Sequence, residues 1–409
     1  MRLPRSALPL GLAASLLVPS IAHAQQLREV DAAVRRGISK GLYPGAVVVI
    51  GRRDTVLYAR GYGHVTWSAK SRVPDPDSTL WDLASLTKVV ATTGAVMRLV
   101  DAGLIDLDAP VVRYLPRFAE SAAAYSAAAG TTPDSAATRE TPDAMAVLDR
   151  RRVTVRMLLD HTSGLPAYVP FYRRAHTAAG AIDLLYAEPL VRAPGDSAEY
   201  SDLNAMVLGL LIEKVSGRPL DRAAAEEVFR PLRLDRTMFR PPAALRSWVA
   251  PSAMYHGRPV REANDQNAVR LGGVAGHAGL FSTGRDLARY AQVWLREGVG
   301  PDGPWVTAET IRQFLTPAPH SGTRLLGWDT RDPTTTAADP SVFGNLIGAG
   351  AYGHTGWTGT ELWIDPARDL FLVLLTNRSF DPRTRRSIEK LKLVRAEVSD
   401  AVLRLAPAD

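Results

Sequence analysis

The chain has 409 residues, of which 46% are hydrophobic and 22% charged, so it is an ordinary globular protein, long enough for two lobes or for one domain with a large insertion. It contains no cysteine, which excludes disulfide bonds, thiolate metal ligands and a cysteine nucleophile. The net charge of +7 is mild and spread along the chain, so we expect no nucleic-acid partner.

The first residues have the pattern of a secretory signal. Arg2 and Arg5 give a basic start, and the apolar run over residues 8–21 is too short for a stable transmembrane helix. Ala22-His23-Ala24 then supplies the small-x-small pattern of a cleavage site. We expect a signal peptide over residues 1–24 and a secreted or periplasmic protein with no integral membrane segment after its removal. An uncleaved anchor is the alternative.

The next part of the chain predicts a helix, a hairpin and a second helix. Residues 27–41 have helical apolar spacing, and the β-rich runs 45–50 and 55–62 are separated by a short polar turn. Residues 85–102 are a strong helix candidate that ends at Gly103. The stretch 119–145 is rich in Ala, Ser, Thr and Pro without periodicity, which is typical of a mobile surface insertion.

The second half of the chain continues with helices and ends in a second hairpin. Residues 203–215 form a helix candidate before Gly217, and Thr283-x-x-Asp286 resembles a capping box that opens a helix over residues 287–296. Residues 360–365 and 370–377 predict a hairpin. Asp381-Pro382 then predicts the start of a long amphipathic helix that reaches about residue 405.

These elements predict an α+β fold in the form of an α/β sandwich. An antiparallel sheet is built from both chain ends, over residues 25–80 and 320–409, and is flanked by helices. A mainly α-helical lobe, residues 85–290, is inserted between them. Residues 25–409 thus form the mature domain.

Ser85 and Lys88 are the first candidates for chemistry. Their spacing of three places a hydroxyl and an amine on one face of a helix, where a base can activate the serine and the helix N-terminus favours negative charge. The pattern alone is weak, because Ser387 and Lys390 repeat it. Ser387 lies in a charged helix, whereas Ser85 precedes an apolar run. We therefore expect Ser85 to be the partly buried, reactive serine.

Two further segments carry candidate residues. Tyr200 lies just before a helix, and a lysine ammonium beside it would lower the pKa of its phenol and let it act as a base. The segment Gly353-His354-Thr355-Gly356-Trp357 precedes a strand, and its glycines allow close backbone approach. The Trp357 and Ser85 amides are therefore candidates for an oxyanion hole. Each segment by itself is more often structural.

In this order the three segments resemble the serine β-lactamase and penicillin-binding protein superfamily, specifically its class C-like branch. That family carries Ser-x-x-Lys, then Tyr-x-Asn, then Lys/His-Thr/Ser-Gly. The resemblance runs from the first hairpin to the C-terminal helix. It includes Leu158 to Leu165, Pro194-Gly195, Leu208-Gly209, Ala278 to Thr283, Leu326-Gly327-Trp328, Ile364-Asp365-Pro366 and Leu374 to Asn377.

The resemblance implies roles for these residues. Ser85 is the nucleophile of an acyl-enzyme, and Lys88 and Tyr200 share the general base and acid work, with the first base left open. Asp202, His354, Thr355, Gly356 and Trp357 bind substrate or form the oxyanion hole. No cofactor and no metal are implied, and the scattered histidines have no metal-ligand spacing.

Two residues depart from the family pattern. Asp202 replaces the family asparagine, and a carboxylate there would pair with Lys88, hold its charge and move the base role toward Tyr200. His354 replaces the lysine that is typical of class C β-lactamases, as in some secreted DD-carboxypeptidases and esterase relatives. We expect it to titrate near its ordinary pKa and to attract a substrate carboxylate only at low pH.

The sequence therefore predicts an exported serine hydrolase of the D-alanyl-D-alanine carboxypeptidase or carboxylesterase type. Its substrate is a small molecule or a peptidoglycan peptide. A β-lactamase and a cell-wall binding protein without turnover are the alternatives. The residues do not distinguish among these acyl substrates, because all of them use the same acyl-serine chemistry. Nothing in the sequence indicates an oligomeric state.

Overall fold

The computed structural model describes residues 21–119, 149–336, 339–380 and 387–406. The first twenty residues of the expected signal peptide, the insertion expected over 119–145 except for its first residue, and the helix start expected at Asp381-Pro382 lie outside these ranges. Among the residues that the structure describes, no helix combines the length and apolarity that a membrane span requires.

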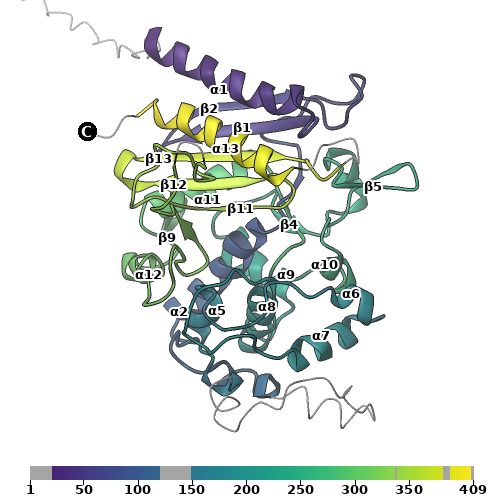
Figure 1. Ribbon diagram of the computed structural model, residues 1–409, viewed down its shortest axis with the longest axis vertical. Helices are drawn as coiled ribbons and strands as arrows, with labels where there is room; N and C mark the ends of the chain where they lie inside the picture. The colour runs from purple at the N-terminus through teal and green to yellow at the C-terminus, as the bar shows by residue number, and fades with distance from the viewer. Residues whose placement is uncertain (1–20, 120–148, 337–338, 381–386, 407–409) are drawn as a thin grey trace, which may run out of the picture.

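A six-stranded antiparallel sheet with the strand order β10-β11-β12-β13-β1-β2 forms the upper half of the molecule (Figure 1). The first strands pair with the last, since Ala46 of β1 lies opposite Thr376 of β13. Both chain ends therefore build one sheet, as the sequence predicted. The strands are β1 Gly45–Gly51, β2 Val56–Gly63, β10 Asp329–Thr330, β11 Tyr352–Thr355, β12 Glu361–Asp365 and β13 Leu370–Thr376.

Helices cover both faces of this sheet. Ala46, Val48 and Ile50 of β1 pack in one core with α1 (Ile21–Ser39) and α13 (Ile388–Leu403). The alternate residues Val47 and Val49 join the second, larger core, which includes α11 (Gly284–Leu295). Because successive side chains of a strand point to opposite faces, a strand covered on both sides is apolar throughout. All seven residues of β1 are accordingly buried.

A helical lobe lies below the sheet and confirms the predicted α+β fold (Figure 1). Leu203 and Leu211 of α8 pack there with Leu158 of α5 in the same core as the sheet. The helices are α2 Gly94–Asp101, α5 Val155–Leu159, α6 Phe171–Arg174, α7 Ala178–Ala187, α8 Asp202–Ser216, α9 Leu220–Ala224, α10 Gln266–Arg270 and α12 Ala308–Phe314. Short strands complete the fold: β3 Trp81–Asp82, β4 Met238–Phe239, β5 Ala253–Tyr255, β6 Arg258–Val260, β7 Leu280–Ser282, β8 Val299–Gly300 and β9 Gly303–Pro304.

One predicted helix start needs a small correction. The helix expected from residue 85 begins at Leu86, and its residues Lys88–Thr93 are π-helical, a form that is common at functional sites. In the described part of the C-terminal helix, α13 begins at Ile388, and the Ser387 side chain caps it by accepting a hydrogen bond from the Lys390 backbone N–H. The predicted capping of α11 by Thr283 is confirmed.

Candidate active site

Ser85 is held in place by a short strand and a tight turn. The strand β3 pairs with β7, and the buried carboxylate of Asp82 accepts a hydrogen bond of 2.9 Å from the Ala84 backbone N–H. Ala84 has a φ of 47°, which is the left-handed region that a residue with a Cβ rarely occupies. Strained backbone of this kind is concentrated at functional sites. The turn brings Ser85 to the start of the helix.

Lys88 lies against Ser85 and against a carboxylate from another segment. Its Nζ is 3.0 Å from Ser85 Oγ and 2.7 Å from an oxygen of Asp202, and it donates a hydrogen bond to the His277 carbonyl. The lysine is buried, which by itself lowers the pKa of an amine, but the charges and hydrogen bonds of Asp202 and Tyr200 together outweigh burial and raise the pKa of Lys88. The predicted pairing of Asp202 with Lys88 is confirmed, and Lys88 is an ammonium at neutral pH.

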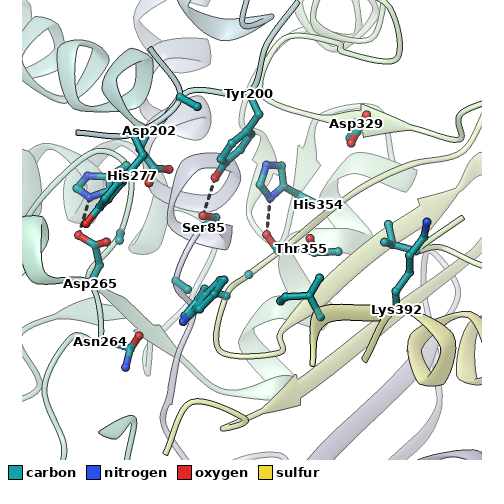
Figure 2. A pocket seen from close by; sticks show the side chains of 18 of the residues that line it. Ser85, Tyr200, Asp202, Asn264, Asp265, His277, Asp329, His354, Thr355 and Lys392 are labelled. Atoms are coloured by element: carbon teal, nitrogen blue, oxygen red, sulfur yellow. Dashed lines mark hydrogen bonds and ion pairs between the residues drawn. The ribbon is translucent and has the colours of Figure 1, made fainter. Parts of the chain in front are cut away.

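Tyr200 reaches Ser85 from the other side, with its hydroxyl 2.7 Å from Ser85 Oγ (Figure 2). Burial raises the pKa of the Tyr200 phenol, and the neighbouring Lys88 charge only partly opposes this. The expectation of a lowered phenol pKa is therefore wrong, because burial raises the pKa by more than the Lys88 ammonium, itself paired with Asp202, lowers it. Both candidate bases thus carry a proton at neutral pH.

Residues 158–165, the segment that resembles the family's His-Thr-Ser-Gly, contact Tyr200 and the residue after it. His161 lies beside it, with ring centroids 5.0 Å apart, and His161 Nδ1 accepts from the Ser201 backbone N–H. Ser201 caps helix α8 by accepting a hydrogen bond from the Asn204 backbone N–H. Asp202 is the first residue of that helix, so capping fixes the direction of both Tyr200 and Asp202.

His354 faces Tyr200 from strand β11, with ring centroids 5.9 Å apart. Burial lowers the pKa of His354 well below its ordinary value, and the charges of Arg324 and Lys88 lower it further. Its Nδ1 lies 2.8 Å from the Thr355 carbonyl oxygen, so Nδ1 carries the proton and donates this bond. The expectation that His354 titrates near its ordinary pKa is wrong, because the ring is buried beside cations.

The turn after Thr355 lies directly against the residues that precede Ser85. The Gly356 N–H donates to the Thr360 carbonyl at 2.8 Å, and the Thr360 hydroxyl donates to the Leu83 carbonyl at 3.0 Å. A Cβ on Gly356 would lie 2.5 Å from that Leu83 oxygen, so only glycine allows this approach. Within the described residues, neither the Ser85 nor the Trp357 backbone N–H donates to a protein acceptor. Both are available to a substrate oxygen.

These residues line one pocket of about 730 Å³, with Ser85 between two chemically different sides (Figure 2). Asp202, Asp265 and His277 lie on one side, and His354, Thr355 and Lys392 lie on the other. The exposed side chains of Tyr168, Trp357 and Ile388 add apolar surface to its lining. The structure therefore brings every predicted site residue except Lys88 to the pocket wall, with Lys88 directly behind Ser85.

Sequence reasoning missed several charged residues of this pocket. Arg324 forms an ion pair of 3.2 Å with Asp329 and lies over the Tyr200 ring, 5.4 Å from its centroid. On the opposite side, the His277 imidazole lies 2.8 Å from the Asp265 carboxylate. Burial alone would raise the pKa of Asp265, but His277 and the Ala268 N–H lower it to about 2. Only His277 had a signal, since it immediately precedes the segment 278–283 that resembles the family.

Asp202, Asp265 and His277 also bring three ligand atoms within 4.8 Å of one another, a spacing that suits a metal ion. The Lys88 ammonium already lies 2.7 Å from the Asp202 carboxylate. A divalent cation would have to share that carboxylate with a like charge, which is unfavourable. The cluster is better described as a partly buried charge network on one side of Ser85 than as a metal site.

Comparison with known proteins finds one matching family and several similar sequences. The family model described as Beta-lactamase matches residues 30–397. An N-acetylmuramyl-L-alanine amidase of Bacillus subtilis (strain 168) is 31% identical over 406 residues, which cover 90% of this chain and 86% of the amidase. An Escherichia coli (strain K12) protein provisionally named D-alanyl-D-alanine carboxypeptidase is 29% identical over 389 residues, covering 88% of this chain and 83% of that protein.

Solved structures show the same fold at lower identity. EstCE1, a hydrolase with promiscuous acyltransferase activity, superposes with a TM-score of 0.69 at 23% identity and covers 93% of this chain and 100% of its own. A class C β-lactamase from Rhodobacter sphaeroides gives a TM-score of 0.67 at 19% identity and covers 92% of this chain and 99% of its own. At these sequence identities the similarity shows a shared fold and nothing more.

A serine hydroxyl between a buried lysine and a half-buried tyrosine, at the wall of an open pocket, defines a serine hydrolase. The chain belongs to the β-lactamase family. The resemblance to the serine β-lactamases and penicillin-binding proteins is thereby confirmed.

Proposed function

We propose that the protein is an exported hydrolase that forms an acyl-enzyme on Ser85 and cleaves the terminal amide bond of D-alanyl-D-alanine peptides from peptidoglycan. The observation that carries the proposal is the position of Ser85 Oγ, 3.0 Å from Lys88 Nζ and 2.7 Å from the Tyr200 hydroxyl. Export rests on the signal pattern of residues 1–24 and on relatives named for cell-wall amide cleavage.

The reaction proceeds in two steps that share one proton route. Once the coupled Lys88 and Tyr200 pair has lost one proton to solvent, Ser85 Oγ attacks the carbonyl carbon, the Ser85 proton passes to that pair, and the Ser85 and Trp357 amides bind the oxyanion. The C–N bond then breaks, and the pair returns the proton to the leaving amine nitrogen. Water hydrolyses the Ser85 ester by the reverse route and frees the acid.

A panel of four substrates tests the proposal. It contains a peptide ending in D-alanyl-D-alanine, N-acetylmuramyl-L-alanine, a p-nitrophenyl ester and a chromogenic cephalosporin. The proposal expects the highest kcat/KM for the peptide. Fastest turnover of the muramyl amide would support the second candidate, an amidase, which the 31% identity to the B. subtilis enzyme favours. Turnover of the ester or the cephalosporin alone would assign the protein to the esterases or the β-lactamases.

Arg324 replaces His354 as the expected anchor for a substrate carboxylate, since His354 is neutral and Arg324 stays charged. We expect Arg324→Met to lower the ratio of kcat/KM for the D-alanyl-D-alanine peptide to that for a neutral ester by roughly tenfold to a hundredfold, the loss of one charged hydrogen bond. Arg156→Met, which removes an arginine of similar exposure paired with Asp108, is the control. The role is wrong if the ratio stays constant in Arg324→Met.

Asp202 sets the pH at which the proton route opens. Because its charge raises the pKa of Lys88, the ammonium must lose its proton before acylation, and kcat/KM should rise with pH above neutrality. In Asp202→Asn the opposing charge is gone, the pKa of Lys88 falls, and the ascending limb should move to lower pH. Stopped-flow measurement of the acylation rate between pH 6 and 10 tests this shift, and the range reaches the ordinary pKa of tyrosine and approaches that of lysine. If the ascending limb of the pH–rate profile stays at the same pH in Asp202→Asn, the proposed coupling between Asp202 and Lys88 is wrong.

A further inference from the structure

Arg395 of the C-terminal helix lies against the turn that follows Thr355, at the wall of the pocket that Ser85 also lines. The arginine is buried, with 5% of its surface exposed, and it comes from α13, which packs with α1 on one face of the sheet (Figure 1). Its Nη2 donates to the Gly356 carbonyl at 2.9 Å and to the Thr360 carbonyl at 2.8 Å. One guanidinium therefore holds both ends of the turn.

The Gly356 carbonyl and the Trp357 N–H belong to the same peptide unit. A peptide unit is planar, and no described peptide bond is cis, so the N–H points away from the carbonyl of its own plane. A donor that fixes the Gly356 oxygen on one side therefore fixes the direction of the Trp357 N–H on the other. It also polarises the unit, which strengthens the N–H as a donor.

A buried carboxylate balances the charge of Arg395. Glu361, the first residue of β12, is fully buried, and its Oε2 lies 3.9 Å from Arg395 Nε. The Ser399 hydroxyl of α13 donates to the other carboxylate oxygen at 3.3 Å. Burial raises the pKa of Glu361 to about 7, and the Arg395 charge partly opposes this rise. Because an isolated charge in such a place is strongly unfavourable, the ionised form of Glu361 stabilises the cation beside the two carbonyls that it holds.

We propose that Arg395 is a positioning residue that aims the Trp357 N–H into the oxyanion hole by holding the Gly356 carbonyl. The inference rests on the proposed function, in which Ser85 is the nucleophile and Trp357 supplies an oxyanion donor. Although Arg395 lines the pocket, its hydrogen bonds go to the Gly356 and Thr360 carbonyls, so it acts through the peptide unit that it holds.

The test compares an ester with its thiono analogue, in which sulfur replaces the carbonyl oxygen that receives the negative charge. Sulfur is larger and a weaker acceptor, so an aimed N–H favours the oxygen ester. We expect Arg395→Met to lower kcat for the oxygen ester roughly tenfold to a hundredfold, up to the effect of losing one oxyanion donor, with KM little changed. The thiono ester should lose less, so the ratio of the two rates should fall.

Arg368→Met is the matched control, because Arg368 also pairs with a buried carboxylate, Asp365, at 2.6 Å and lies just beyond the far end of β12. It should leave the rate ratio unchanged. Arg395→Lys keeps the charge but has no planar fork, so it should restore part of the ratio and serves as the test if Arg395→Met does not fold. The inference is wrong if folded Arg395→Met has the same rate ratio as the unmodified protein. If Arg395→Met does not fold, the same result in Arg395→Lys would overturn it. Failure to label Ser85 in the unmodified protein would instead overturn the proposed function.

Discussion

Replacement of Ser85 by alanine is expected to abolish covalent labelling and to lower kcat by roughly 10⁵-fold or more, since removal of the nucleophile of such a site leaves only binding and oxyanion stabilisation. The hydroxyl is the atom that Lys88 and Tyr200 both contact, and no neighbouring group can replace it. Intact-mass measurement and peptide mapping after a fluorophosphonate or a penicillin will locate the adduct.

Ser387→Ala is the matched control, because Ser387 and Lys390 repeat the Ser-x-x-Lys spacing elsewhere in the chain. The structure gives Ser387 a different task, since its hydroxyl caps helix α13 through the Lys390 backbone N–H at 3.2 Å. We expect Ser387→Ala to keep full labelling and to lose about 1 kcal/mol of stability, the usual effect of removing a cap. An adduct on Ser387, or full activity in Ser85→Ala, would contradict the assignment of the nucleophile.

The second large effect is expected for Tyr200→Phe, which should lower kcat for an amide substrate by roughly 10²–10⁴-fold, the usual contribution of general acid–base catalysis. The phenol lies 2.7 Å from Ser85 Oγ and 5.0 Å, measured from its ring centroid, from Lys88 Nζ, so it can relay a proton between the serine and a leaving group. An amine cannot leave without a proton, whereas p-nitrophenolate can. The loss should therefore be much smaller for a p-nitrophenyl ester.

Tyr290→Phe controls for the loss of a buried phenol. Tyr290 is fully buried and donates to the Val89 carbonyl at 2.7 Å, so its replacement should cost about 1 kcal/mol of stability and leave the amide-to-ester ratio unchanged. The proton relay through Tyr200 would be refuted by equal losses of amide and ester turnover in Tyr200→Phe. Thermal unfolding of each variant will show that the protein measured is folded.

Local sequence patterns were sufficient for the two hairpins of the sheet and for its long helices, but not for strands β10 and β11. The strands of each hairpin alternate their side chains between two apolar cores, and a helix that begins with a capping residue such as Thr283 is marked by its own residues. The cap of α13 by Ser387 was not predicted, because Ser387 was considered only as half of a second Ser-x-x-Lys match and Asp381-Pro382 offered an acceptable start earlier in the chain.

The sequence by itself also determined the family and the identity of Ser85, Lys88 and Tyr200 as candidates, because each lies in a motif with fixed neighbours. It could not give the protonation states, since the burial that raises the pKa of Tyr200 and lowers that of His354 comes from residues far along the chain. Arg324 and Arg395 carry no local signal either. Only the tertiary structure placed their charges at the pocket, because desolvation and electrostatic attraction depend on distance in space and not on separation in sequence.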